Sequence, residues 1–208
     1  SPGGGDVLFH LDPLWADDNI DFIGIDNYLP ISDWRDAEVQ ADSAKSIYDL
    51  DYLQANIEGG EYFDWYYIND ESRRLQLRRP IEDGAYHEAW IYRAKDLRSW
   101  WGLPHSNRLN GVREANYTAW EPQSKPIWFT ELGCPAIDKG TNQPNRFLDP
   151  KSSESALPRG SNGLRDDLMQ LAYYQVMHRF WTDAAQNPQA FLYNGPMLDF
   201  AQSLAWAW

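Results

Sequence analysis

The sequence predicts an α/β protein in which helices cover a parallel sheet. Two runs of mostly apolar residues, at 21–28 and 126–133, are typical of strands buried on both faces. Apolar residues recur at helical spacing after each run, at 47–57 and at 164–181. Strands that alternate with helices along a chain commonly pair in parallel, so this order of elements indicates a layered α/β domain.

The first predicted strand covers residues 21–28 and ends in polar side chains. Its last three residues are Asp26, Asn27 and Tyr28, and Pro30 follows them. In parallel α/β barrels the carboxyl ends of the strands carry the chemistry. These three side chains are therefore candidates for positioning a substrate.

A long excursion separates the first strand from the second. It contains a predicted helix at 47–57, which the pair Gly59-Gly60 ends. Residues 61–121 are rich in Trp, Tyr and Arg, and we expect one short helix there that ends at residues 100–102. The sequence thus predicts an insertion over about residues 36–122, far longer than the usual connection, and such segments often carry function.

The second predicted strand covers residues 126–133 and carries Glu131 near its carboxyl end. A loop with many Pro and Gly residues follows at 134–163. An amphipathic helix is predicted at 164–181, with Ser161 or Asn162 as its N-cap. The chain stops in an apolar run at 204–208 that is typical of a strand in mid-course, so we expect the sequence to be an excerpt of a longer polypeptide.

Composition argues against several classes of function. Lys and Arg total 18 against 31 for Asp and Glu, a formal net charge of −13, and so acidic a surface repels the phosphates of nucleic acids. The sequence contains no apolar stretch of the ~18 residues that span a membrane. Cys134 is the only cysteine and reads as a buried bystander thiol. The four histidines lie far apart, and we expect no metal or organic cofactor.

The aromatic content is high, at 15% of the chain with 11 tryptophans. Flat aromatic faces that bear a polar group suit sugar rings, whose C–H faces are rimmed by hydroxyls. Large aromatic side chains that only fill a wide core explain the composition equally well.

Glu131 is the leading candidate for a catalytic residue, because a carboxylate at the end of an apolar strand would lie at a barrel mouth, with Trp128 close by. Hydrolysis of a glycosidic bond needs two carboxyl groups, and Glu131 could supply the first. The alternative is a structural glutamate that pairs with an arginine or caps the next loop. For the second carboxyl group, none of the candidates has a distinctive spacing: Asp26, Asp33, Asp83 and Glu154.

Three segments together resemble a known family. They are residues 6–36 (DVLFHLDPLWADDNIDFIGIDNYLPISDWRD), residues 95–101 with Lys95-Asp96-Leu97 and Trp100-Trp101, and residues 124–155 (SKPIWFTELGCPAIDKGTNQPNRFLDPKSSES). This pattern resembles the TIM-barrel-like domain of gene transfer agent and phage tail host-specificity proteins, whose barrel is similar to glycoside hydrolases. The resemblance covers nearly the whole chain.

The resemblance implies that residues 1–208 form the C-terminal part of a (β/α)₈ barrel, with residues 22–28, 127–133 and 204–208 as its sixth, seventh and eighth strands. In retaining glycosidases of this architecture the seventh strand ends in the nucleophilic glutamate, which is the place of Glu131. The acid/base glutamate ends the fourth strand, and it would precede residue 1.

The sequence and the resemblance together predict a baseplate or tail domain of a phage-like particle that acts on cell-envelope carbohydrate, with other tail proteins as partners. A non-catalytic receptor-binding module and a structural spacer remain alternatives. If the domain is an enzyme, Glu131 is its nucleophile. The residues expected to position the sugar are Asp26, Asn27, Tyr28, Asp33, Trp34, Arg35 and Trp128.

Overall fold

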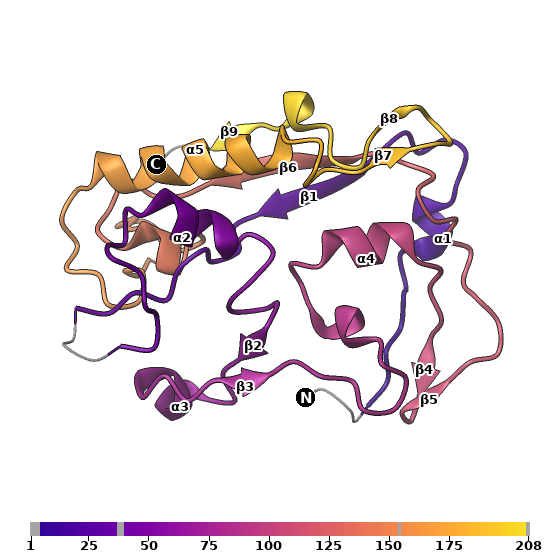
Figure 1. The fold of residues 1–208 in the computed structure, drawn as a ribbon, viewed down its shortest axis with the longest axis horizontal. Helices are drawn as coiled ribbons and strands as arrows, with labels where there is room; N and C mark the ends of the chain where they lie inside the picture. The colour runs from indigo at the N-terminus through magenta and orange to yellow at the C-terminus, as the bar shows by residue number, and fades with distance from the viewer. Residues whose placement is uncertain (1–4, 37–39, 154, 207–208) are drawn as a thin grey trace.

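The computed structural model describes residues 5–36, 40–153 and 155–206. Its central element is a three-stranded sheet of β1 (Ile23–Asn27), β6 (Ile127–Gly133) and β9 (Ala205–Trp206), in the order β1-β6-β9 (Figure 1). Both pairings are parallel, as the apolar runs predict. Over the described residues the sheet is open, with β1 and β9 at its edges, and no closed barrel forms.

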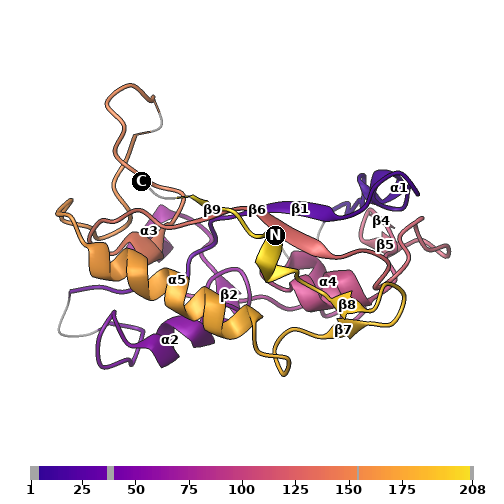
Figure 2. The ribbon, with the colours of Figure 1, turned by 90° about the horizontal axis from the view of Figure 1, so that it is seen from above.

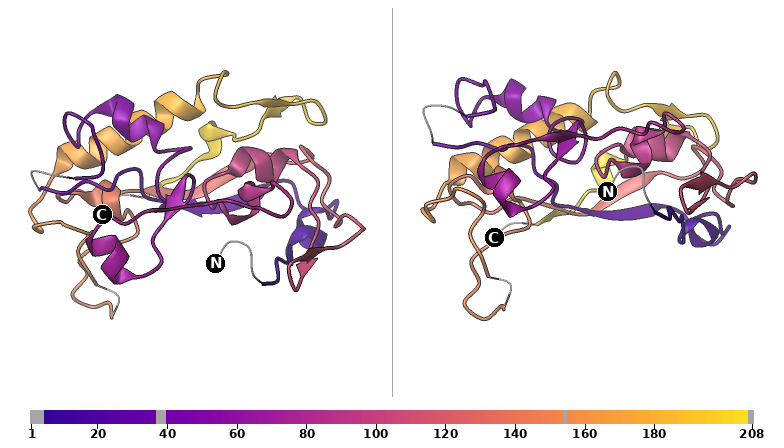
Figure 3. Two further views of the ribbon diagram at one scale, coloured as in Figure 1. Left: turned by 60° about the horizontal axis from the view of Figure 1, so that its bottom comes forward. Right: turned by 90° about the horizontal axis from the view of Figure 1, so that it is seen from below.

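The sheet buries one face under a helical layer. Ile127 and Phe129 of β6 are fully buried, and the ring of Phe129 meets that of Trp181 edge-on at 5.9 Å. Seen from above, α5 (Asp167–Trp181), α2 (Leu50–Ala55) and α4 (Leu97–Gly102) lie on the same side of the sheet (Figure 2). In the right-hand view of Figure 3, β1 (indigo) lies toward the lower margin and α5 (orange) lies above it.

Helix α5 confirms the predicted helix but not its predicted cap. Its N-cap is Asp166, whose carboxylate accepts a hydrogen bond from the backbone N–H of Met169, so the expectation of Ser161 or Asn162 was wrong. The buried face also differs from the row of leucines that the spacing suggests. Leu168 and Leu171 are about half exposed. The buried residues are Met169, Ala172, Tyr173, Val176, Met177, Phe180 and Trp181.

Helix α2 is shorter than its periodicity predicts because Asp49 begins it. The Asp49 carboxylate accepts hydrogen bonds from the N–H groups of Asp51 and Tyr52. Leu53 and Ile57 are buried against α5, and Ile47 is buried just before the helix.

The long excursion contains short elements around one expected helix, α4. Asn110 and Gly111 both take positive φ, as the tight hairpin between β4 (Arg108–Leu109) and β5 (Val112–Arg113) requires. The other elements are β2 (Trp65–Tyr66), α3 (Asp70–Arg74), β3 (Arg79–Pro80), the 3₁₀ turn η1 (Ala89–Tyr92), β4 (Arg108–Leu109) and β5 (Val112–Arg113).

Five further elements were not predicted. Helix α1 (Asp12–Trp15) precedes β1, and the 3₁₀ turn η2 (Gly140–Asn142) follows β6. A hairpin of β7 (Gln189–Ala190) and β8 (Gly195–Pro196) leads through η3 (Phe200–Gln202) into β9. Ala207 and Trp208 of the predicted last strand lie outside the described residues. Among the described helices, none has the length and apolar character that a membrane crossing requires.

Candidate functional site

The strand register places Glu131 beside Asp26 on the sheet face that points away from α5. Ile25 pairs with Phe129, and both line a small enclosed cavity with residues of α5. The next pair is Asp26 with Glu131, so β6 contains one extra residue, Thr130, at a β-bulge. Without this bulge, strict alternation would turn Glu131 toward the helices.

Contacts across the strands confirm this orientation. The Thr130 hydroxyl donates to the Asp26 carboxylate at 2.8 Å, and a Cβ on Gly24 would lie 3.0 Å from the Thr130 methyl group. Gly24 and Asp26 are two residues apart in β1 and therefore share a face. Asp26 is exposed and Glu131 is partly buried. Two carboxylates thus lie side by side on the face that α5 does not cover.

Tyr28 fixes the orientation of the Glu131 carboxylate. Its hydroxyl donates a hydrogen bond of 2.6 Å to Glu131 Oε2. Partial burial and this bond to a carboxylate raise the pKa of Tyr28 above its ordinary value, so the hydroxyl stays a donor at neutral pH. Among the described residues, no Lys or Arg forms an ion pair with Glu131. The carboxylate is therefore oriented without being neutralised.

The end of β6 is packed closely enough to require glycine. A Cβ on Gly133 would lie 2.4 Å from the carbonyl oxygen of Trp206 and 3.1 Å from the Tyr28 ring. The Tyr174 hydroxyl of α5 donates to the same Trp206 carbonyl at 2.8 Å. Gly133 and Tyr174 thus hold β9 and the Tyr28 ring beside the site, a role that no sequence pattern indicates for either residue.

Trp128 and Asn27 lie close to Glu131 along the strands, but much of the surface of each is already in contact with other residues of the protein. The Trp128 indole stacks on Phe22 at a centroid distance of 3.7 Å. Asn27 is buried, and its backbone carbonyl accepts a hydrogen bond of 3.4 Å from Tyr173.

Asp33 and Arg35 belong to a separate polar cluster. Asp33 is almost fully buried and forms ion pairs with Arg35 at 2.9 Å and Arg78 at 3.1 Å. Burial alone would raise the pKa of Asp33, but hydrogen bonds from Tyr67 and Gln76 and the charge of Arg35 hold it below its ordinary value. Among the described residues, no contact joins Asp33 or Arg35 to Glu131.

Trp34 is held next to this cluster by Asn142 of η2. The Asn142 side chain accepts from Trp34 N–H at 2.9 Å and donates to its carbonyl at 3.0 Å. It also accepts from the Ser32 hydroxyl and donates to the Arg159 carbonyl. Fully buried Asn142 thereby joins the loops that follow β1 and β6, and only its place after a predicted strand could have drawn attention to it.

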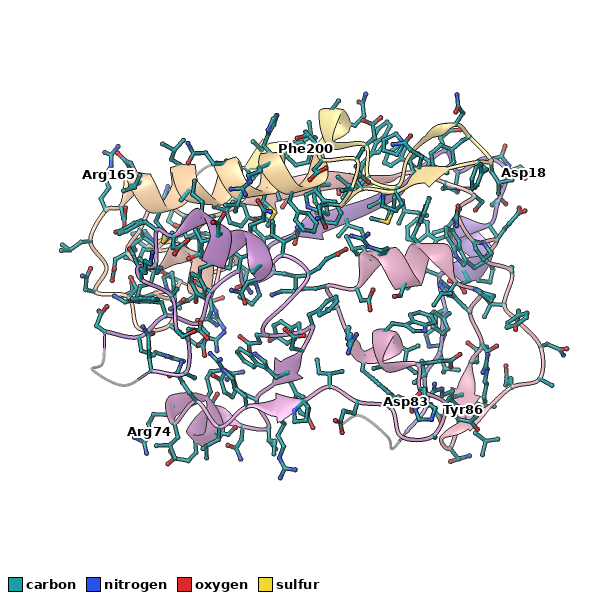
Figure 4. All side chains as sticks on the ribbon, in the orientation of Figure 1. Asp18, Arg74, Asp83, Tyr86, Arg165 and Phe200 are labelled. Carbon is teal, nitrogen blue, oxygen red and sulfur yellow. The ribbon has the colours of Figure 1, made fainter. Side chains whose placement is uncertain are left out.

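Of the two other candidate carboxyl groups, Asp83 does not join the site. Asp83 lies across the molecule from Phe200, which belongs to the 3₁₀ turn beside β6 (Figure 4). A hydrogen bond from Arg108 lowers the pKa of Asp83 to about 2, so this residue is ionised and suits no acid role. Glu154 lies outside the described residues. The described residues contain no group of three or more His, Cys, Asp or Glu side chains arranged to hold a metal.

A separate groove of about 530 Å³ runs along β1 near α1 and α4. Trp15, Trp90 and Trp100 line it, together with Arg93 and Asp96. Glu131 and Asp26 do not line it. Tryptophan side chains therefore line this groove as well as the core.

Comparison with known protein families gives one match over the full length of the chain. The family described as the GTA TIM-barrel-like domain matches residues 1–208. A search of curated proteins finds no match to the chain.

Proposed function

The chain belongs to the family of GTA TIM-barrel-like domains, and on this premise we propose that it acts on cell-envelope carbohydrate from the tail of a phage-like particle. The observation that carries the proposal is the environment of Glu131. This carboxylate ends a parallel strand, points away from the helices, receives a hydrogen bond from Tyr28 and forms no ion pair among the described residues. Parallel barrels place their catalytic groups at such positions.

In the proposed reaction Glu131 is the nucleophile of a retaining glycosidase. An oxygen of its carboxylate attacks the anomeric carbon and forms a glycosyl ester, while the bond from that carbon to the leaving oxygen breaks. The leaving oxygen takes a proton from a carboxylic acid that we expect to come from outside residues 1–208. Water activated by the same group then hydrolyses the ester. Tyr28 orients the nucleophile in both steps.

The other predicted residues differ in how directly they are proposed to contact the sugar. Asp26 and Trp128 share the face of Glu131 and are the nearest candidates for sugar contacts. Asn27 and Trp34 act through the backbone and loops that they hold. Asp33 and Arg35 are proposed only to stabilise the loop that carries Trp34, because their charged groups are already paired.

The test uses the whole protein, incubated with envelope glycans, and measures new reducing ends. We expect Glu131→Gln to lower the rate roughly a thousandfold or more while binding is retained, since it removes the attacking group. Glu121→Gln, at an exposed loop residue, is the matched control. Equal rates for Glu131→Gln and wild type would refute the nucleophile role.

The groove beside β1 favours a second candidate function, a receptor-binding module without catalysis. Its tryptophans and its Arg93–Asp96 ion pair could contact the faces and hydroxyls of a sugar. This alternative predicts binding without cleavage, lost in Trp15→Ala and retained in Glu131→Gln. If neither variant changes binding or cleavage and the wild type does neither, the spacer alternative is favoured.

A further inference from the structure

The groove beside β1 has aromatic walls that are open to a ligand. Its volume of about 530 Å³ lies in the range of sites that take a small molecule. Trp15 of α1, Trp90 of η1 and Trp100 of α4 line it, and each of these side chains is half-buried. None of their indole N–H groups donates a hydrogen bond to a described residue. The walls therefore offer both flat faces and free donors.

A buried histidine fixes the two sides of this groove relative to each other. His105 Nδ1 lies 2.8 Å from Asp12 Oδ2 in α1, and Nε2 lies 2.7 Å from the backbone carbonyl oxygen of Trp100 in α4. The His105 ring also packs against Trp90, at 5.5 Å between centroids. A site whose walls are already positioned loses little conformational freedom when a ligand binds. The groove is therefore preorganised.

Arg93 is a lining residue whose hydrogen-bond donors are unused. Its guanidinium packs over the Phe63 ring at 4.9 Å. Its contact with Asp96 is long, because Nη1 lies 3.7 Å from Oδ2, beyond hydrogen-bond range. Within the described part of the chain the guanidinium donates no hydrogen bond, and Nε is buried without a partner. A planar cation with five N–H donors is thus positioned at the groove and left unpaired.

The nearby acidic residues do not cancel this charge. The Asp96 carboxylate accepts a hydrogen bond of 3.1 Å from the Ser99 N–H and caps α4. Its side chain is 8% exposed, against 27% for Arg93, so the more accessible charge is the positive one. Arg93 also borders an open depression with Glu82 and Asp83, whose charges disfavour an anion there. An anionic group is therefore best received from the side of the groove.

We propose that this groove binds a carboxylated sugar, whose ring stacks on the tryptophans and whose carboxylate pairs with Arg93. A guanidinium and a carboxylate match in two parallel N–H···O bonds, a geometry that a single hydroxyl group does not offer. The net charge of −13 disfavours a dense polyanion, so the ligand carries isolated carboxylates among neutral sugars. The proposal rests on the second candidate function, glycan binding in the groove, and does not depend on Glu131.

The test measures binding of the whole protein to an oligosaccharide in which glucuronic acid alternates with a neutral sugar, and to its methyl ester, by isothermal titration calorimetry. The ester keeps the rings and removes the charge. We expect wild type to bind the acid about 10- to 100-fold more tightly than the ester, and Arg93→Gln to bind both as weakly as wild type binds the ester. Arg165→Gln, at an 82% exposed side chain that does not line the groove, makes the same change in net charge and should bind like wild type.

Trp15→Ala separates the carboxylate assignment from glycan binding itself. It removes one wall, so we expect it to weaken binding of both the acid and the ester. Equal affinity of wild type for the two compounds, with weaker binding of both by Trp15→Ala, would overturn the carboxylate assignment and leave glycan binding in the groove intact. Absence of binding, or binding that neither variant changes, would overturn both.

The ester also reports on the fold of the arginine variant. Retained binding of the ester by Arg93→Gln shows that the groove is formed. If this variant does not fold, Arg93→Lys replaces it, because lysine keeps the charge but not the paired donors. We then expect the acid to bind several-fold more weakly than to wild type, and unchanged affinity would overturn the paired contact.

Discussion

The carboxylates of Glu131 and Asp33 differ in how completely the protein satisfies them. Asp33 is buried and receives hydrogen bonds from two arginines, a tyrosine and a glutamine. Among the described residues, the Glu131 carboxylate receives one hydrogen bond, from Tyr28, and part of its surface stays open. Glu131 lies near the end of β6 and Asp33 in the loop after β1, and of the two carboxylates Glu131 has bonding capacity left for a ligand. The difference shows that position near a strand end does not define a site unless the group is also left free to react.

The largest expected effect on the free energy of unfolding comes from disrupting the polar cluster around Asp33. Asp33→Ala leaves Arg35 and Arg78 without their shared partner in a buried setting, so we expect a loss of about 3–5 kcal/mol in the free energy of unfolding. Asp26→Ala, the matched change at the open face, should cost no more than ~0.5 kcal/mol. Urea unfolding measures both. Equal losses of unfolding free energy in the two variants would show that the Asp33 cluster and the face that carries Asp26 and Glu131 do not differ in this respect.

Lys95 extends the comparison to a buried cation. Its ammonium donates to the carbonyls of Asn56 and Gly59, and burial lowers its pKa to about 7. The unfolded state binds the proton up to a pH of about 10.5, so between these values the unfolded state holds more protons and stability rises with pH.

We therefore expect the stability of wild type relative to Lys95→Met to increase by up to ~1.4 kcal/mol per pH unit between pH 7 and 9. Thermal unfolding across this range is the measurement, with exposed Lys45→Met as the control. A constant difference would mean that Lys95 stays charged throughout.

A smaller effect should follow from Gly133→Ala, which sharpens the comparison at the open site. The added methyl group meets the Trp206 carbonyl at 2.4 Å and the Tyr28 ring at 3.1 Å, so we expect a loss of about 1–3 kcal/mol and a weaker bond from Tyr28 to Glu131. Gly84→Ala, which has nothing within 4 Å, is the control. Comparable stability for both variants would show that β9 can shift to accommodate the added methyl group at little cost in free energy.

The smallest effect is expected from Tyr28→Phe. It removes the hydrogen bond from Tyr28 to Glu131 and should cost about 0.5–1.5 kcal/mol in unfolding free energy, because the carboxylate can turn to water. Tyr117→Phe, at a ring that is 61% exposed, is the control. A loss of stability as large as that of Asp33→Ala would mean that the Glu131 carboxylate depends on its protein partners as strongly as the Asp33 carboxylate does.

The sequence predicted the large elements of the fold and the leading carboxylate. The apolar runs of β1 and β6 identify buried strands because continuous burial leaves a continuous pattern. The buried face of α5 was harder to predict, since Leu168 and Leu171 lie on its exposed side and only packing selects Met169 and Tyr173 for burial. The β7–β8 hairpin was missed although its Asn194-Gly195 pair is a turn signal.

The details of the site could not be predicted, because they depend on contacts between distant segments. Asp33 meets Tyr67 and Arg78 only after the excursion folds back, so its pattern resembles that of any loop aspartate. The same holds for His105, whose partner Asp12 lies 93 residues away. For Glu131, the sequence indicated the strand end but not the bulge that turns it away from the helices.

That bulge determines which face of the sheet the Glu131 carboxylate lies on. Between Phe129, which faces α5, and Glu131, which faces away from it, there is one residue in β6 where β1 has none. Deleting Thr130 would remove the bulge but leave Glu131 facing away from α5 and Leu132 facing it. Adding one residue to β1 opposite Thr130 would instead restore strict alternation and turn Glu131 toward the helices. The orientation of the acidic group therefore depends on the number of residues in β1 relative to β6 and not only on their identity.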